Sequence, residues 1–323
     1  MTAAGRHVVT VFGVKSEDEL PGLASIRDVV ELRLAPTEED LARVIGDTDI
    51  LMSWDFRAGV LRGVWPDARR LRWVHWAGAG VDAALFPELR DSDVLLTNAR
   101  GIFDRPMAEY VLGLVLCFAK GFPRTIRSQS RRHWDFRLTE YINGGTALVV
   151  GVGNIGREIA TLLSAAGMRL IGVGRSARAG DPLFGDIHGL GELDRLLARA
   201  DYVINITPST PDTRGLFSTD RFAGMKPSAR FINVGRGDAV DQDALVDALR
   251  NKLIAGAALD VFAEEPLPET SPLWEMDNVI VSPHVSGDIA DSHAALVAQF
   301  IENLHRFTRG EPLRNVVDKN KGY

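Results

Sequence analysis

Short apolar segments alternate with longer amphipathic segments along the whole chain. In the first hundred residues, apolar runs rich in β-branched residues predict strands at residues 7–13, 28–34, 49–53, 72–76 and 93–96. Helical patterns lie between them, such as TEEDLARVI, in which Thr37 is placed to cap a helix with Asp40 three residues on. Because strands and helices alternate in this way, the pattern predicts an α/β fold with a parallel sheet.

A second alternating series begins at Thr146, after a strongly apolar helix predicted over residues 105–122 and a segment rich in arginine and aromatic residues. Its strands are expected in six apolar runs: ALVVGVG, RLIGVG, DYVINIT, ARFINVG, IAGAALDV and NVIVSPH. Six strands is the number of a complete dinucleotide-binding sheet. The chain then continues into an amphipathic helix, DSHAALVAQFIENLHRFTRG, and the tail EPLRNVV.

The last helix and the tail have no strand of their own to cover, so we expect them to pack on the N-terminal sheet. A chain of 323 residues also exceeds the size at which one hydrophobic core usually keeps growing. We therefore predict a Rossmann cofactor domain at residues 101–289, inserted into a discontinuous, flavodoxin-like domain formed by residues 1–100 and 290–323. Both domains are expected to be doubly wound, with a hinge and a cleft where the chain crosses between them.

The composition argues against several classes of function. With 46% hydrophobic and 25% charged residues and a net charge of −6, the chain has no general electrostatic preference for nucleic acid or an anionic membrane. No apolar run reaches the roughly 20 residues that cross a bilayer, and HVVTVFGV is followed by acidic residues rather than a cleavage site. The single Cys117 excludes an internal disulfide framework, and the histidines lack metal-ligand spacing. We expect a cytoplasmic protein without a metal.

The stretch LVVGVGNIGREIATLL carries the most specific motif. Gly151, Gly153 and Gly156 have the G-x-G-x-x-G spacing, with a predicted strand before them and a helix after them. In such a turn the first glycine permits the tight bend, the second lets the backbone approach a pyrophosphate, and the third allows close helix–strand packing. The amides of Asn154 and Ile155 then lie at a helix N-terminus, where the dipole favours an anion. The motif predicts a dinucleotide cofactor.

The end of the next strand bears on which dinucleotide binds. NAD sites usually carry an acidic residue about 20 positions after the glycine turn, to bind the ribose 2′-hydroxyl. Here Gly174 stands in that place, followed by Arg175, Ser176 and Arg178. Two guanidiniums and a hydroxyl are suited to a 2′-phosphate, although they are also compatible with a solvated loop. We predict a preference for NADP(H), with NAD(H) as the alternative cofactor.

Three polar residues follow later strands, at the edge where open α/β sheets bind ligands. Arg236 comes after FINVG, Glu265 after LDVFAE, and His284 after VIVSP. Each alone is explained equally well as a surface charge, a loop acid or a strand-end histidine. Together they place a cation, a carboxylate and a titratable base on one edge, which is the set that reduction of a keto acid needs.

These motifs resemble those of the D-isomer-specific 2-hydroxyacid dehydrogenase family. VVGVGNIGREIA, MKPSARFINVGRGDAVDQDALVDAL, GAALDVFAEEPLP and VIVSPHVSG are similar to the family's motifs in their usual order, and WAGAGVDAAL and NARGIFDRPMAEYVLG extend the resemblance toward the N-terminus. The resemblance is greatest to glyoxylate/hydroxypyruvate reductase-like members. It implies that His284, Glu265 and Arg236 are catalytic. Glu264 is a rival in register, but the family's glutamate immediately precedes the proline.

The resemblance also implies that the discontinuous domain, residues 1–100 and 290–323, is the substrate domain. It further implies contacts to substrate and cofactor. Ala79 and Gly80 match the turn whose backbone amides hold the substrate carboxylate. Trp54 matches a position near the substrate side chain, with a packing role equally open, and His75 beside the turn is expected to pack at a strand end. Further cofactor contacts, with Asp260 on the nicotinamide side, are expected at Thr207, Pro208, Val234 and Asp260.

Two other segments are interpreted through the same resemblance. The basic aromatic segment RSQSRRHWDF, which contains His133, is expected to form a homodimer interface rather than a nucleic-acid site. After His284 the chain reads VSGD where the family often has a GSGxT-like or GAGxT-like sequence. This departure places Asp288 near the rim, where it either discourages long acidic substrates or caps the following helix.

The implied function is that of an oxidoreductase that reduces a small 2-keto acid, such as glyoxylate or hydroxypyruvate, to the D-2-hydroxy acid. NADPH would supply the hydride, His284 would act as general acid/base, Glu265 would orient it, and Arg236 would bind the substrate oxygens. The alternative is a non-catalytic NAD(P)-sensing protein, like the corepressor-like relatives of the family. The presence of all three catalytic residue types favours the enzyme.

Overall fold

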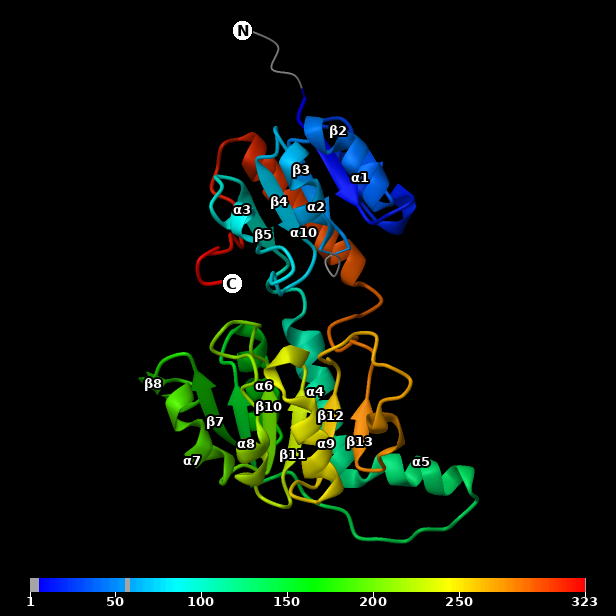
Figure 1. The fold of residues 1–323 in the computed structure, drawn as a ribbon, viewed down its shortest axis with the longest axis vertical. Helices are drawn as coiled ribbons and strands as arrows, with labels where there is room; N and C mark the ends of the chain where they lie inside the picture. The colour runs from blue at the N-terminus through cyan, green and yellow to red at the C-terminus, as the bar shows by residue number, and fades with distance from the viewer. Residues whose placement is uncertain (1–5, 56–58, 323) are drawn as a thin grey trace. The chain divides into compact units, whose positions relative to one another are not determined.

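The computed structural model describes residues 6–55 and 59–322, and contacts divide the chain into two units (Figure 1). The first unit is formed by the chain up to Ile102 together with the chain from Ile289 onward, and the second unit is Phe103–Asp288. Each unit contains a largely parallel sheet with helices around it. The predicted α/β class with parallel sheets is confirmed.

The first unit holds five parallel strands in the order β2-β1-β3-β4-β5, which is the flavodoxin-like order. Each overlaps one of the predicted strands: β1 Val8–Phe12, β2 Glu31–Ala35, β3 Ile50–Ser53, β4 Trp73–Trp76 and β5 Leu95–Asn98. Strand β2 ends one residue after its predicted range and β5 ends two residues after its own. Alternate residues of a strand face opposite sides of the sheet. Val11 and Trp73 therefore belong to one buried cluster, and Leu51 and Val74 to another.

Helices cover both faces of this sheet. The C-terminal helix α10 (Ser292–Thr308) buries Phe300 and Leu304 in the cluster that contains Val11. The opposite face is covered by α1 (Glu38–Val44), α2 (Val60–Val64) and α3 (Pro87–Arg90). The predicted cap of α1 is present, because the Thr37 side chain accepts from the Asp40 amide at 3.2 Å and the Asp40 carboxylate accepts from the Thr37 amide.

The second unit holds eight strands in the order β13-β12-β11-β10-β6-β7-β9-β8, of which only β8 is antiparallel to its neighbour. The six predicted runs match β6 Thr146–Val150, which begins one residue before its run, β7 Arg169–Gly174, β10 Tyr202–Asn205, β11 Arg230–Asn233, β12 Gly256–Leu259 and β13 Val279–Val281. The prediction of six strands was incomplete. It lacked β8 (Arg178–Asp181) and β9 (Gly185–Gly189), in which Ile187 is the one buried residue, so no apolar run marks them.

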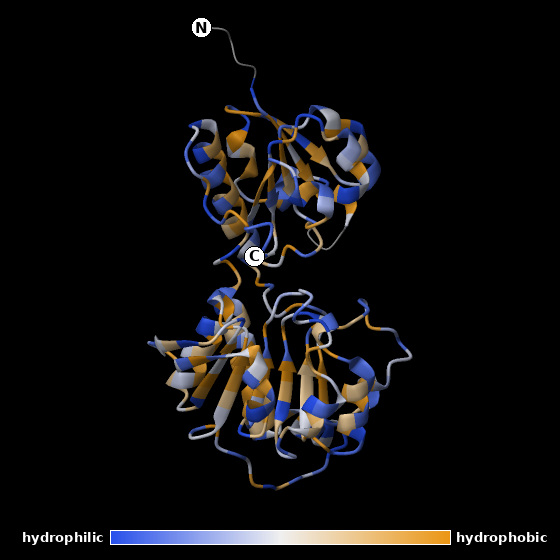
Figure 2. Ribbon diagram, turned by 60° about the vertical axis from the view of Figure 1, so that its left-hand side comes forward, coloured by the Kyte–Doolittle hydropathy of each residue, from blue (hydrophilic) through white to orange (hydrophobic). Residues whose placement is uncertain are grey.

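Helices of the second unit are α4 Asp104–Lys120, α5 Phe122–Ser130, α6 Asn154–Ala165, α7 Leu193–Leu197, α8 Thr219–Ala223 and α9 Gln242–Arg250. Short 3₁₀ turns of both units are η1 Glu17–Glu19, η2 Leu23–Ile26, η3 Ile45–Asp47, η4 Trp65–Asp67, η5 Leu190–Glu192, η6 Gly237–Ala239 and η7 Pro272–Glu275. Figure 2 shows that hydrophobic residues follow the strands of both sheets. This pattern explains why the strands were easier to predict from the sequence than the helices.

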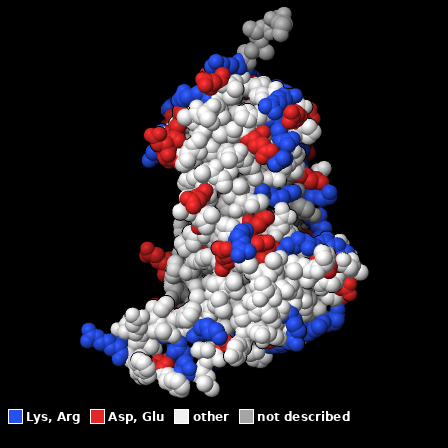
Figure 3. Space-filling view, turned by 180° about the vertical axis from the view of Figure 1, so that it is seen from behind, with Lys and Arg blue, Asp and Glu red and all other residues white. Residues whose placement is uncertain are grey.

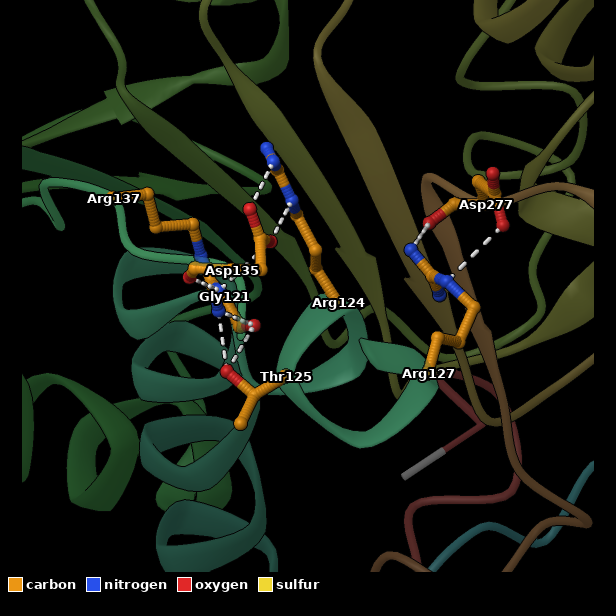
Figure 4. Close-up of polar contacts among 7 residues, drawn as sticks. All are labelled: Gly121, Arg124, Thr125, Arg127, Asp135, Arg137 and Asp277. Atoms are coloured by element: carbon orange, nitrogen blue, oxygen red, sulfur yellow. Dashed lines mark hydrogen bonds and ion pairs between the residues drawn. The ribbon is translucent and has the colours of Figure 1, made fainter. Parts of the chain in front are cut away.

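The segment after α5, residues 131–145, has no regular secondary structure before β6, and we call it the arm. Successive side chains of the arm alternate in direction. Trp134, Phe136 and Leu138 point outward and are between 84% and 93% exposed. Asp135 and Arg137 turn instead toward α5 (Figure 4). Polar contacts fix this arrangement: Arg124 donates twice to the Asp135 carboxylate at 2.6 and 2.8 Å, and Arg137 donates to the Gly121 carbonyl at 2.7 Å and to the Thr125 hydroxyl. The arm therefore presents its apolar side outward.

Acidic and basic side chains are interspersed over the surface in view in Figure 3. An anion site therefore depends on local groups rather than on net charge. Across the described residues, none of the helices has the length and apolar character needed to cross a membrane.

Candidate active site

The glycine turn between β6 and α6 has the geometry that its spacing predicts. Gly151 has φ +109°, and a Cβ there would lie 2.6 Å from the Ile206 carbonyl oxygen. A Cβ on Gly156 would lie 1.9 Å from the Gly151 carbonyl oxygen, so the turn closes tightly on itself. Gly153 differs, because nothing lies within 4 Å of its Cβ position. The turn is therefore packed on its inner side, and its middle glycine leaves space for a ligand beside the backbone.

Helix α6 begins at Asn154, so the amides of Asn154 and Ile155 belong to its first turn, where no carbonyl of the helix itself can accept from them. Strand β6, which leads into this turn, lies between β7 and β10. The connections of the sheet reverse direction at that point, and open α/β sheets bind ligands there. Two amides and a helix dipole at such a point can hold a phosphate.

The residues after β7 lie on the surface. Arg175 and Ser176 are exposed, and Gly174 leaves little room for another side chain, since a Cβ there would lie 3.0 Å from the Val152 side chain. The alternative interpretation placed Arg178 in a solvated loop, but Arg178 begins strand β8. We call Arg175, Ser176 and Arg178 the β7–β8 segment; each of its side chains is exposed, and the residue before it, where NAD sites usually carry an acid, is Gly174.

An acid that the sequence analysis did not consider lies next to this segment. Asp181 at the end of β8 pairs with Arg157 of α6, and its carboxylate is 3.9 Å from the Arg178 guanidinium. The hydrogen bond from Arg157, helped by the Leu183 and Phe184 amides, lowers the pKa of Asp181 to about 2. Asp181 is therefore ionised at neutral pH and ties β8 to the helix that starts at the glycine turn.

His284 and Glu265 lie side by side after β13 and β12. The His284 Nδ1 is 2.7 Å from Glu265 Oε2, and the other carboxylate oxygen accepts from the Phe262 amide at 2.9 Å. Burial raises the pKa of Glu265, but hydrogen bonds from His284 and Phe262 and the charges of His284 and Arg236 outweigh it, so the pKa lies below its usual range. Glu265, not Glu264, is thus the residue that contacts the imidazole, and it is ionised at neutral pH.

Arg236 follows β11 between two glycines that bring three loops together. A Cβ on Gly235 would lie 2.8 Å from the Thr207 carbonyl oxygen, and one on Gly237 would lie 1.9 Å from the Phe262 carbonyl. No other residue fits at either position without moving backbone. The loops after β10, β11 and β12 therefore cross at Arg236, whose charge reaches Glu265. We call Arg236, Glu265 and His284 the rim.

Asp260 holds the loop that carries His284. Its side chain is 0% exposed and accepts from the Ser282 hydroxyl at 2.7 Å and from the Val285 and Ser286 amides at 3.0 and 2.9 Å. Its carbonyl accepts from the His284 amide at 2.9 Å, and His284 has φ +55°. Because these bonds surround His284 on both sides in sequence, Asp260 fixes an unusual backbone conformation at the histidine. The predicted nicotinamide contact of Asp260 stays a prediction.

A pair of buried asparagines joins the ends of β10 and β11. The Asn205 side chain donates to Asn233 Oδ1 at 2.9 Å and accepts from the Thr207 hydroxyl at 2.8 Å, while Asn233 donates to the Arg236 carbonyl at 3.1 Å. Val234 is buried beside them, and Pro208 is exposed. Neither asparagine was predicted from the sequence. The available signal was that both strands, YVIN and RFIN, end in the same residue.

The first unit holds the remaining predicted residues. Ala79 and Gly80 are partly exposed in the loop after β4, where the preceding Ala77 is buried. Trp54 is partly buried against the core and its ring meets that of His293 edge-on, with centroids 4.9 Å apart. His75 is fully buried between Thr97 and Phe300, and burial lowers its pKa to about 3. His75 is therefore a neutral packing residue.

The capping role expected for Asp288 was wrong. Helix α10 begins at Ser292 and its N-cap is Asp291, three residues after Asp288. The other interpretation, that the Asp288 charge discourages long acidic substrates, stays a prediction. Within residues 6–55 and 59–322, no group of three or more His, Cys, Asp or Glu side chains is arranged to hold a metal.

Comparison with known proteins supplies the family. A sequence model described as D-isomer specific 2-hydroxyacid dehydrogenase, NAD binding domain, matches residues 112–286. The chain is 32% identical over 306 residues to the D-3-phosphoglycerate dehydrogenase of Methanocaldococcus jannaschii, covering 94% of this chain and 57% of that protein. The chain thus spans little more than half the length of that relative.

Solved structures also match nearly the whole chain. A D-isomer specific 2-hydroxyacid dehydrogenase from Xanthobacter autotrophicus Py2, in complex with NADPH and MES, is 32% identical with a TM-score of 0.82, covering 99% of this chain and 100% of that one. An NADPH-dependent glyoxylate/hydroxypyruvate reductase from Sinorhizobium meliloti, in complex with NADP and sulfate, is 29% identical with a TM-score of 0.85, covering 98% and 100%.

Proposed function

Since this chain belongs to the D-isomer specific 2-hydroxyacid dehydrogenase family, we propose that it reduces a small 2-keto acid to the D-2-hydroxy acid with NADPH. The observation that carries the proposal is the 2.7 Å contact of His284 with Glu265, at the end of the sheet that carries the glycine turn. A titratable base held by an ionised carboxylate is suited to exchanging a proton with the substrate oxygen. Glyoxylate and hydroxypyruvate are the first candidates for the keto acid.

The roles of the rim follow from its chemistry. A bound nicotinamide supplies the hydride that reaches the 2-carbon. The imidazolium of His284 donates its proton to the developing alkoxide, and the Glu265 carboxylate keeps the ring oriented through its contact with Nδ1. Arg236 binds the carboxylate and carbonyl oxygens of the substrate and stabilises the negative charge that develops on the carbonyl oxygen.

Cofactor binding is proposed at the glycine turn and the β7–β8 segment. The amides of Asn154 and Ile155 bind the pyrophosphate, and Thr207, Pro208, Val234 and Asp260 line the cofactor farther along. Arg175, Ser176 and Arg178 bind the 2′-phosphate of NADP(H), with NAD(H) as the weaker alternative. The absence of an acid at Gly174 and the NADPH and NADP complexes of two similar structures support this preference.

On the substrate side, the amides of Ala79 and Gly80 are proposed to bind the carboxylate, and Trp54 to contact the substrate side chain. A corepressor-like, non-catalytic function is the less favoured candidate, because a sensing protein has no need for His284 and Glu265 in hydrogen-bond contact.

We also propose a homodimer formed through α5 and the arm. The outward Trp134, Phe136 and Leu138 form an apolar surface that a second copy would cover. Phe136→Glu, which places a charge on that surface, is expected to give a monomer. Light scattering after size-exclusion chromatography measures the mass, with Thr139→Glu on the same arm as the control. A monomeric wild type would contradict the proposal.

The experiment that tests the activity is a panel of glyoxylate, hydroxypyruvate, pyruvate, phenylpyruvate and branched 2-keto acids, each with NADPH and with NADH. Reduction of at least one small keto acid, with kcat/KM favouring NADPH, is the expected result. A higher kcat/KM with NADH overturns the cofactor preference, and no oxidation of either cofactor by any keto acid overturns the activity.

A further inference from the structure

The loop after β4 is braced by the end of the neighbouring strand β5. Asn98, the last residue of β5, donates from its Nδ2 to the Ala79 carbonyl at 2.7 Å. The next amide, that of Ala99, donates to the Gly78 carbonyl at 3.0 Å. Two successive carbonyls of the loop therefore point toward the end of β5.

The planarity of the peptide bond sets the direction of the amides. In a trans peptide the N–H points to the side opposite the carbonyl oxygen. Because the Gly78 and Ala79 carbonyls both point toward β5, the amides of Ala79 and Gly80 both point away from it. Within the described part of the chain, neither amide donates to a backbone carbonyl. Two adjacent amides that share a direction are suited to binding an anion.

Asn98 is an unusual residue for this place in the core. It is 3% exposed, and its Oδ1 is buried without a hydrogen-bond partner among the described residues. A buried oxygen without a partner destabilises the folded state, and native structures contain few of them. An apolar side chain of the same size would avoid this cost if Asn98 only filled space. The donor end of the side chain is thus the part that has a use.

We infer that Asn98 is a positioning residue for the substrate: it fixes the Ala79–Gly80 peptide so that both amides are directed at the substrate carboxylate before it binds. The inference rests on the proposed function, because it concerns the same carboxylate contacts. It adds a residue that touches neither substrate nor cofactor and acts through the loop. Without the Asn98 donor, the peptide is free to rotate and the amides lose their common direction.

The test compares Asn98→Leu and Asn98→Ala with a matched control, Asn315→Gly, in the full-length protein. Asn315 also donates its side-chain amide to a carbonyl of the first unit, that of Arg100 at 2.9 Å, and its φ of +56° suits glycine. The probe is oxamate, an unreactive analogue of a 2-keto acid, titrated into the NADPH-loaded protein. Both Asn98 variants are expected to raise the oxamate Kd and the keto-acid KM about 5- to 30-fold, with kcat and NADPH affinity little changed.

The outcomes separate a positioning role from a packing role. Unchanged oxamate affinity in folded Asn98 variants overturns the inference. So does a parallel loss of oxamate affinity, NADPH affinity and kcat, or an equal effect of Asn315→Gly, because each indicates a general defect of the fold. A wild type that does not bind oxamate also overturns it. If oxamate binds in an Asn98-dependent way and no keto acid is reduced, the inference stands and the proposed activity fails.

Discussion

The rim and the β7–β8 segment belong to the same sheet, but they are held in different ways. Beneath the rim, Asp260 and Asn233 are 0% and 1% exposed, and their hydrogen bonds fix the backbone at His284 and Arg236. In the β7–β8 segment the side chains are exposed, and the Arg178 guanidinium is 3.9 Å from Asp181. Proton transfer needs groups fixed at hydrogen-bond distance, whereas charge attraction acts over longer distances. We therefore expect substitutions in the rim to cost far more than substitutions in the segment.

The largest effect is expected at the rim itself. His284→Ala removes the proton donor and should lower kcat about 10²- to 10⁴-fold while leaving NADPH affinity nearly unchanged. Steady-state kinetics with the best keto acid and fluorescence titration of NADPH measure the two quantities. A variant with near-normal kcat would show that His284 is not the acid and would remove the basis of the comparison.

The next largest effect is expected at Asp260, whose hydrogen bonds support the rim. Asp260→Ala leaves the Ser282 hydroxyl and two amides without their acceptor and should lower the free energy of unfolding by about 3 kcal/mol or more. Asp260→Asn keeps the shape and one acceptor, so its loss should be smaller. Urea denaturation measures both. Equal stability of Asp260→Ala and the wild type would mean that the rim is no better supported than the β7–β8 segment.

A third effect is expected in the first unit, where the buried His75 must stay neutral for the unit to remain folded. The pKa of His75 is about 3 in the folded protein, against 6.5 for a free histidine. Between these values the unfolded state binds more protons, so stability falls as the pH drops below 6.5, by about 2 kcal/mol at pH 5. His75→Phe should remove this part of the pH dependence in urea unfolding followed by tryptophan fluorescence. Identical pH slopes for the two proteins would contradict it.

The smallest effect is expected in the β7–β8 segment. Arg175→Ala should raise the KM for NADPH about 5- to 10-fold and leave the KM for NADH unchanged, because only NADPH carries the 2′-phosphate. Arg178→Ala should act in the same direction and more weakly, since its guanidinium also lies near Asp181. If both cofactors weaken equally, the segment shapes the binding site rather than selecting the phosphate.

The contrast also explains how much of the fold was predictable. Strands with apolar runs, such as VVTVF in β1 and TALVV in β6, are readable because buried parallel strands are hydrophobic on both faces. Strands β8 and β9 are short and polar and lie at the edge of the sheet, and Ile187 is their one buried residue. Nothing in RAGD or GDIHG distinguishes an edge strand from a loop.

In the candidate site, the residues within motifs could be predicted from the sequence. The residues whose hydrogen bonds hold the loops of the site in place could not. The ends of successive parallel strands meet at one edge, so the positions of Glu265 and His284 in the sequence indicated a common site. Asp260 was expected to contact the cofactor, but its three hydrogen bonds to the Ser282–Ser286 loop depend on how that loop turns back. Asn98 gave no signal, because its role depends on a neighbouring loop 19 residues away in sequence.

The central proposal is that this protein transfers a hydride from NADPH to a keto acid. Isotope transfer measures this step directly. The purified protein is incubated with glyoxylate or hydroxypyruvate and NADPH that carries deuterium at both C4 positions of the nicotinamide, and the product is examined by NMR. The account predicts one deuterium at C2 of a 2-hydroxy acid, which for hydroxypyruvate has the D configuration. Unlabelled product, or oxidation of NADPH without formation of a 2-hydroxy acid, would contradict it.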